Sequence, residues 1–185
     1  RHYRGNQLVI AMKYSVDEAI QILDRAHSVL TVLLNDLPGE WVMNNEGPGT
    51  FSPYDVVGHL IHGEKTDWRP RAEMILEFGL SKTFIPYDRF AQYQESKGKT
   101  LPQLLDEFKS VRAKNTQWLR ELSLTENDLD KKGMHPGLGE VTLRQLLSTW
   151  VVHDLTHIAQ VGRVMAKQYK EEMGPWVEYF RIMNS

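Results

Sequence analysis

The chain has 185 residues, 41% of them hydrophobic and 25% charged, with a formal net charge of −2 at pH 7. These values are typical of a single soluble globular domain, and they argue against nucleic-acid binding, which needs a basic surface. No apolar stretch approaches the roughly 20 residues of a membrane helix, so we expect no membrane span. The sequence contains no cysteine, which excludes disulfides, thiolate metal ligands and a cysteine nucleophile and fits a cytoplasmic protein.

The beginning of the chain has a short apolar patch at residues 8–11, too short for the core of a signal peptide. Met12 is a candidate native start. We therefore interpret residues 1–11 as an N-terminal extension that need not be native, followed by one domain over residues 12–185.

Four segments combine a helix-capping pattern with apolar residues at helical spacing. Pro70 falls inside the second segment and should kink it or divide it in two. The predicted starts of the four helices are Ser15, Ser52, Thr100 and Thr142.

The links between these segments are residues 38–51, 79–99 and 131–141, which we interpret as irregular, and a short helix is expected after Gly174 and Pro175. No β alternation is evident. The pattern predicts an all-α four-helix bundle with long crossover loops, a fold that builds metal sites from side chains on facing helices.

The fourth segment carries His153 and His157, four residues apart. Residues i and i+4 of a helix lie on one face, so two imidazoles at this spacing can bind one metal ion from one side. Both histidines share a stripe with Trp150 and should point inward, where a metal ion or a buried hydrogen-bond network would satisfy them. His59, on the inward face of the second segment, is a candidate third ligand.

The remaining polar candidates are weaker. His62 could replace His59 as a ligand, but we interpret it as partly exposed. His27 is interpreted as structural and His135 as an exposed loop residue. Three carboxylates lie near the proposed ligands and are interpreted as solvent-facing: Asp154, Glu64 and Asp67. Asp154 could instead support a ligating imidazole. Glu64 and Asp67 could instead pair with His59 or act as a base.

Several motifs in this order resemble the DinB-like (DinB/YfiT) superfamily, over about residues 15–183. The matching segments are residues 52–60, residues 135–143, Trp150 with residues 153–160, and the end of the chain from Tyr169 to Tyr179. The resemblance implies a four-helix bundle, a divalent metal held by His59, His153 and His157, and a homodimer. It implies zinc or nickel as the usual ion, which three imidazoles suit.

Activities differ within this family. The resemblance implies either a transferase that uses a low-molecular-weight thiol such as bacillithiol or mycothiol, or a metal-dependent hydrolase. Our leading expectation is a thiol S-transferase acting on a small molecule, with the thiol supplied by a cofactor and loops 79–99 and 131–141 roofing the pocket. A hydrolase would need a general base, for which the sequence offers Glu64, Asp67 and His62. A non-catalytic, stress-related metal-binding bundle is the third hypothesis.

Overall fold

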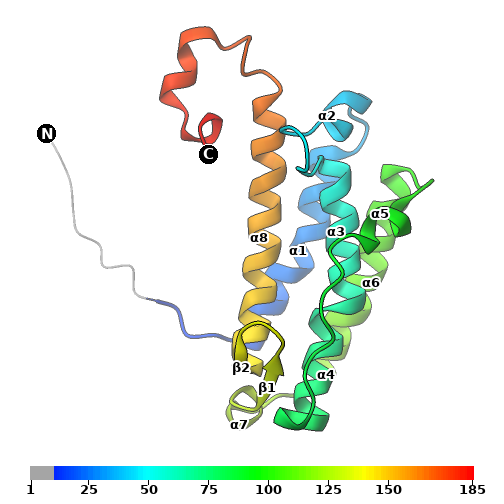
Figure 1. Cartoon of the computed structure of the whole chain (residues 1–185), viewed down its shortest axis with the longest axis vertical. Coiled ribbons are helices and arrows are strands. Elements are labelled where there is room, and N and C mark those ends of the chain that lie inside the picture. Colours follow the sequence, from blue (N-terminus) through cyan, green and yellow to red (C-terminus); the bar gives the residue numbers. More distant parts are fainter. Residues whose placement is uncertain (1–10) are drawn as a thin grey trace, which may run out of the picture.

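The computed structural model describes residues 11–185, so the predicted N-terminal extension lies outside the described residues except at Ala11. Within this range four long helical segments form a bundle, as predicted (Figure 1). Its helices α1 and α8 run in one direction, and α3, α4 and α6 run in the other (Figure 1). The bounds of these elements are α1 (Val16–Leu34), α3 (Pro53–Thr66), its continuation α4 (Trp68–Phe78), α6 (Leu101–Glu121) and α8 (Leu143–Lys167).

The helices begin where the capping patterns place them. The Ser52 hydroxyl accepts a hydrogen bond from the Asp55 backbone N–H at 3.1 Å, and the Asp55 carboxylate accepts one from the Ser52 N–H at 2.9 Å. The same reciprocal box starts α6 at Thr100 and α8 at Thr142. The second segment is divided in two, as expected, but the division comes three residues before Pro70. Pro70 therefore lies in the first turn of α4, where its missing N–H costs no helical hydrogen bond.

The links contain more structure than the sequence indicates. The first contains α2 (Gly39–Met43), and the crossover contains the 3-10 turn η1 (Gly79–Ser81) and α5 (Ala91–Ser96). This crossover carries the chain back along the bundle, so that α6 runs parallel to α3 (Figure 1). The helix α7 (Glu126–Leu129) follows α6, and the tail after α8 forms the 3-10 turns η2 (Gly174–Tyr179) and η3 (Arg181–Met183).

The prediction that residues 131–141 are irregular is wrong, because they form most of an antiparallel hairpin of β1 (Lys132–His135) and β2 (Gly139–Thr142). Tertiary contacts hold this hairpin. The Phe84 N–H donates to the Met134 carbonyl at 2.9 Å, and the Phe84 side chain is buried. At Gly133, a Cβ atom would come within 2.6 Å of the Ile75 side chain, so a glycine lets the strand approach the bundle closely.

The buried interior consists of two apolar clusters with a polar layer between them. Along α6, Phe108 belongs to one cluster and Leu119 to the other, with the buried side chains of Arg112 and Asn115 between them. This layer meets the middle of the bundle, where α3 and α8 face each other. Among the described helices, none combines the length and apolar character required to cross a membrane.

Candidate metal centre

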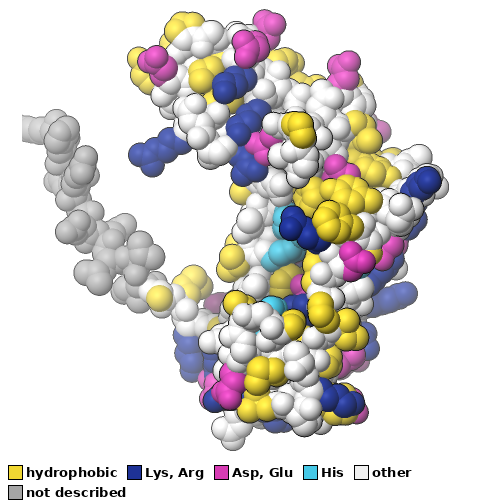
Figure 2. Space-filling model, viewed as in Figure 1, with side chains coloured by type: hydrophobic (Ala, Val, Ile, Leu, Met, Phe, Trp, Pro, Cys, Tyr) yellow, Lys and Arg dark blue, Asp and Glu magenta, His cyan; other side chains and the backbone are white. Residues whose placement is uncertain are grey.

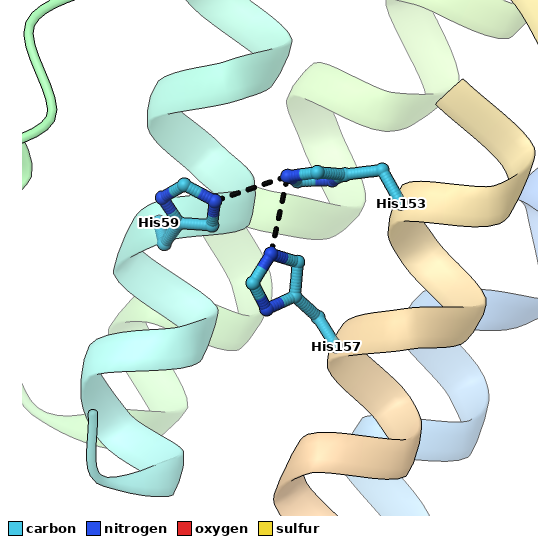
Figure 3. A group of neighbouring side chains, drawn as sticks. All are labelled: His59, His153 and His157. Atoms are coloured by element: carbon cyan, nitrogen blue, oxygen red, sulfur yellow. Dashed lines mark hydrogen bonds between the residues drawn. The ribbon is translucent and has the colours of Figure 1, made fainter. Parts of the chain in front are cut away.

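Three imidazoles converge between α3 and α8. His59 comes from α3, and His153 and His157 lie one turn apart on α8, so that all three rings point into the same space (Figure 3). The Nε2 atom of His153 lies 3.0 Å from that of His59 and 3.1 Å from that of His157. One nitrogen from each ring can be chosen so that all three lie within 4.8 Å of one another.

These separations fit a shared ion. Imidazole nitrogens bound to zinc at about 2.0–2.1 Å lie roughly 2.9 Å apart at right angles and roughly 3.4 Å apart in a tetrahedral arrangement. The two short Nε2 separations fall in that interval. Three neutral imidazoles suit zinc, nickel, iron and copper, and a divalent ion bound by three protein ligands retains open coordination positions.

Amide side chains hold two of these rings in the tautomer that metal binding needs. Nδ1 of His59 lies 2.8 Å from Oε1 of Gln92, and Nδ1 of His157 lies 2.7 Å from Oε1 of Gln160. Because an amide oxygen can only accept, each Nδ1 carries the proton and each Nε2 keeps its lone pair. The buried Nδ1 of His153 has no hydrogen-bond partner among residues 11–185.

The environment keeps the three rings uncharged. Burial, reinforced by the neighbouring His157, lowers the pKa of His59 to about 4. Burial and the two other histidines lower the pKa of His153 to about 3. Burial also lowers the pKa of His157, while its bond to Gln160 opposes this shift. All three are therefore neutral near pH 7, the protonation state in which imidazole binds a metal.

Aromatic side chains surround the imidazoles. The Trp68 ring centroid lies 4.9 Å from that of His153, and the Phe51 centroid lies 5.4 Å from that of His59. The hydroxyl of Tyr87, from the crossover, lies 3.2 Å from Nδ1 of His59. The crossover thus contacts the centre directly, in agreement with the expected position of the 79–99 loop.

Behind the centre, one guanidinium joins the helices. Arg112 on α6 donates to both oxygens of Asp154 at 2.6 and 3.0 Å and to Oε1 of Glu64 at 2.7 Å. It also donates to the Leu23 carbonyl of α1 at 2.6 Å. Trp150 donates from Nε1 to the same Glu64 oxygen at 2.8 Å. The prediction that Asp154 and Glu64 face solvent is therefore wrong: both are buried, and neither is available as a base.

The other candidates also differ from expectation. The prediction that His62 is partly exposed is wrong, because the residue is 3% exposed and its Nδ1 lies 3.0 Å from Oε1 of Glu95. Asp67 is half-buried and pairs with Arg71 at 2.7 Å, so its predicted solvent-facing position is wrong. His135 is also half-buried rather than exposed. Neither His62 nor His135 belongs to the group of three histidines that the structure brings together.

Sequence reasoning missed Gln92 and Gln160, which hold two of the ligands, and Glu95, which pairs with His62. Gln160 follows His157 by three residues on α8, so helical spacing alone could have indicated it. Gln92 and Glu95 lie on α5, whose few residues give no period to recognise. No local signal links them to the helix α3 that they contact.

The comparisons agree with this architecture. The profile of the DinB superfamily matches residues 22–161. The chain belongs to the DinB superfamily. Among solved structures, this DinB-superfamily chain is similar to YfiT from Bacillus subtilis, with a TM-score of 0.70 and 20% sequence identity over 90% of this chain and 94% of that one. YfiT is described as a probable metal-dependent hydrolase with an unusual four-helix bundle topology. No curated protein matches the chain.

Proposed function

We propose that the chain binds one divalent metal ion, zinc or nickel, through Nε2 of His59, His153 and His157, and that it is a metal-dependent hydrolase of ester or amide bonds. The observation that carries the metal proposal is the convergence of three neutral imidazoles, with Nε2 of His153 within 3.0–3.1 Å of Nε2 of the other two. An ion held there would supply Lewis-acid chemistry by polarising a carbonyl group.

Hydrolysis is favoured over thiol transfer by a feature beside the triad. His62, a turn after His59, carries a carboxylate partner and a free Nε2, which suits a general base. The description of YfiT as a probable hydrolase agrees with this proposal. The S-transferase expectation rests on the family resemblance alone, and the two activities differ in their need for a thiol.

The test begins with metal analysis of the purified protein by mass spectrometry. We expect about one equivalent of zinc or nickel in the wild type and almost none in His153→Ala or His157→Ala, because two imidazoles bind far more weakly than three. His27→Ala, a histidine on α1 outside the triad, is the matched control and should keep its metal. Full occupancy in His153→Ala would disprove the ligand assignment.

The second arm measures turnover of p-nitrophenyl acetate and of an acyl anilide, with and without added bacillithiol. A hydrolase should act without thiol, lose activity with a chelator and regain it with zinc or nickel. Turnover that requires the thiol would replace hydrolysis with S-transfer.

A further inference from the structure

The short helix α5 presents two polar side chains to two histidines of α3 in matched register. Gln92 lies 2.8 Å from Nδ1 of His59, and Glu95 lies 3.0 Å from Nδ1 of His62. The two histidines are three residues apart on α3, and Gln92 and Glu95 are three residues apart on α5. Residues i and i+3 are neighbours on one face of a helix. The two helices therefore form two equivalent imidazole–acceptor pairs side by side.

The two acceptors differ in a way that separates the roles of the histidines. Gln92 is a neutral amide, which fixes the tautomer of a ring beside a bound cation without adding charge. Glu95 is a carboxylate, which both orients an imidazole and stabilises the imidazolium that forms when the ring accepts a proton. The amide suits a ring that remains neutral, and the carboxylate suits a ring whose charge changes.

The second nitrogen of His62 is left unused by the fold. Its Nδ1–H points to Glu95, so Nε2 is an acceptor, and this buried atom has no partner among residues 11–185. The His62 side chain is only 4% exposed. Leaving a buried acceptor without a partner costs free energy, so an unpaired Nε2 is unexpected in a purely structural histidine. His27, by contrast, uses its Nε2 in a 3.0 Å bond with Thr31.

This pair adjoins the triad. The Tyr87 ring contacts both histidines, with its centroid 5.1 Å from that of His62 and 5.9 Å from that of His59. Figure 2 shows histidine side chains in a hollow on this face of the molecule. His62 follows His59 by about one turn of α3, so the dyad lies beside the triad.

We propose that His62 and Glu95 form a general-base dyad for the hydrolysis proposed above, on which this inference rests. His62 Nε2 accepts a proton from the attacking water as the water oxygen bonds to the carbonyl carbon and the carbonyl π electrons move to its oxygen. The protonated ring then returns that proton to the leaving oxygen or nitrogen as its bond to carbon breaks. Glu95 orients the His62 ring through Nδ1 and acts as a positioning residue.

The test compares Glu95→Gln and His62→Gln with Gln92→Ala, using p-nitrophenyl acetate as the probe. We expect His62→Gln to lower kcat about 100-fold or more, and Glu95→Gln at least about tenfold, with KM nearly unchanged. Both should keep the zinc affinity of the wild type. Gln92→Ala, which removes the hydrogen-bond partner of a ligand, should reduce the zinc affinity about 10- to 100-fold. Glu77→Gln, at an exposed position of α4, is the control for loss of a carboxylate.

A readout independent of turnover comes from ¹⁵N-histidine NMR of the metal-free protein. His62 should appear in the Nδ1–H tautomer, and Glu95→Ala should remove its downfield Nδ1 proton signal. An Nε2–H tautomer, or a Glu95→Gln rate equal to that of an active wild type, would overturn the dyad alone. A wild type that hydrolyses no ester or amide would overturn the proposed function and the base role together.

Discussion

Histidine protonation links the candidate metal centre to pH. The pKa of His59 is lowered to about 4 and that of His153 to about 3, in both cases chiefly by burial, from an ordinary value of 6.5. An exposed cluster of histidines would take up protons near pH 6 and then repel a cation. In this chain, the same burial that disfavours the imidazolium keeps the Nε2 lone pairs available.

The metal-free protein should therefore lose stability in mild acid. Between about pH 6.5 and pH 4 the unfolded chain binds protons at His59 and His153 that the folded chain does not, so the free energy of unfolding falls as the pH falls. Urea unfolding of the chelator-treated protein at pH 7.5 and pH 5 measures this difference. A His59→Gln/His153→Gln double variant should show a weaker pH dependence. An equal pH dependence in both proteins would show that these two histidines do not cause it.

At the level of helices and strands, local signals explain what the sequence predicts well. The caps at Ser52, Thr100 and Thr142 and the apolar spacing after them depend on neighbours three or four residues away. The hairpin has no such signal, because its strands are short, contain Gly133 and Gly139, and depend on the distant Phe84. Local patterns predicted the helices that carry the triad, but not the hairpin or α5.

The same limit applies to the site. The spacing of His153 and His157 is visible in the sequence, and the family resemblance indicates His59. Asp154 and Glu64 were interpreted as solvent-facing because charged residues are seldom fully buried. Their partner Arg112 lies 42 and 48 residues away, a pairing that only the packed bundle reveals.

Removing this guanidinium tests how strongly it joins the helices. Arg112→Met keeps an apolar stem but leaves two buried carboxylates uncompensated, so we expect a loss of about 3–5 kcal/mol in the free energy of unfolding. Burial already raises the pKa of Asp154 to about 6 against the opposing effect of Arg112. Lys132→Met, which removes an exposed partner of Glu140, should leave the free energy of unfolding nearly unchanged. Similar losses in the two variants, measured by urea unfolding, would contradict this account.

For the molecule as a whole, the topology means that the three-histidine site forms only in the folded chain. His59 and His153 are separated by 94 positions in the chain and meet only because α3 and α8 run antiparallel beside each other (Figure 1). Contacts with α1 and α6 complete the bundle around them. A divalent ion would therefore bind the folded chain much more tightly than the unfolded one. Homodimerisation, which the family resemblance implies, stays a prediction.

Metal binding should accordingly raise the melting temperature. At a free zinc concentration 1,000 times the Kd, ligand linkage adds about 4 kcal/mol to the free energy of unfolding, roughly 8–16 °C for a chain of this size. Differential scanning calorimetry of chelator-treated protein, before and after addition of zinc, measures the shift. Magnesium, which prefers oxygen ligands, should produce almost none. His59→Gln retains the two histidines of α8 but removes the ligand of α3, so zinc should no longer stabilise the contact between these helices. A full shift in that variant would place the ion away from the interface of α3 and α8.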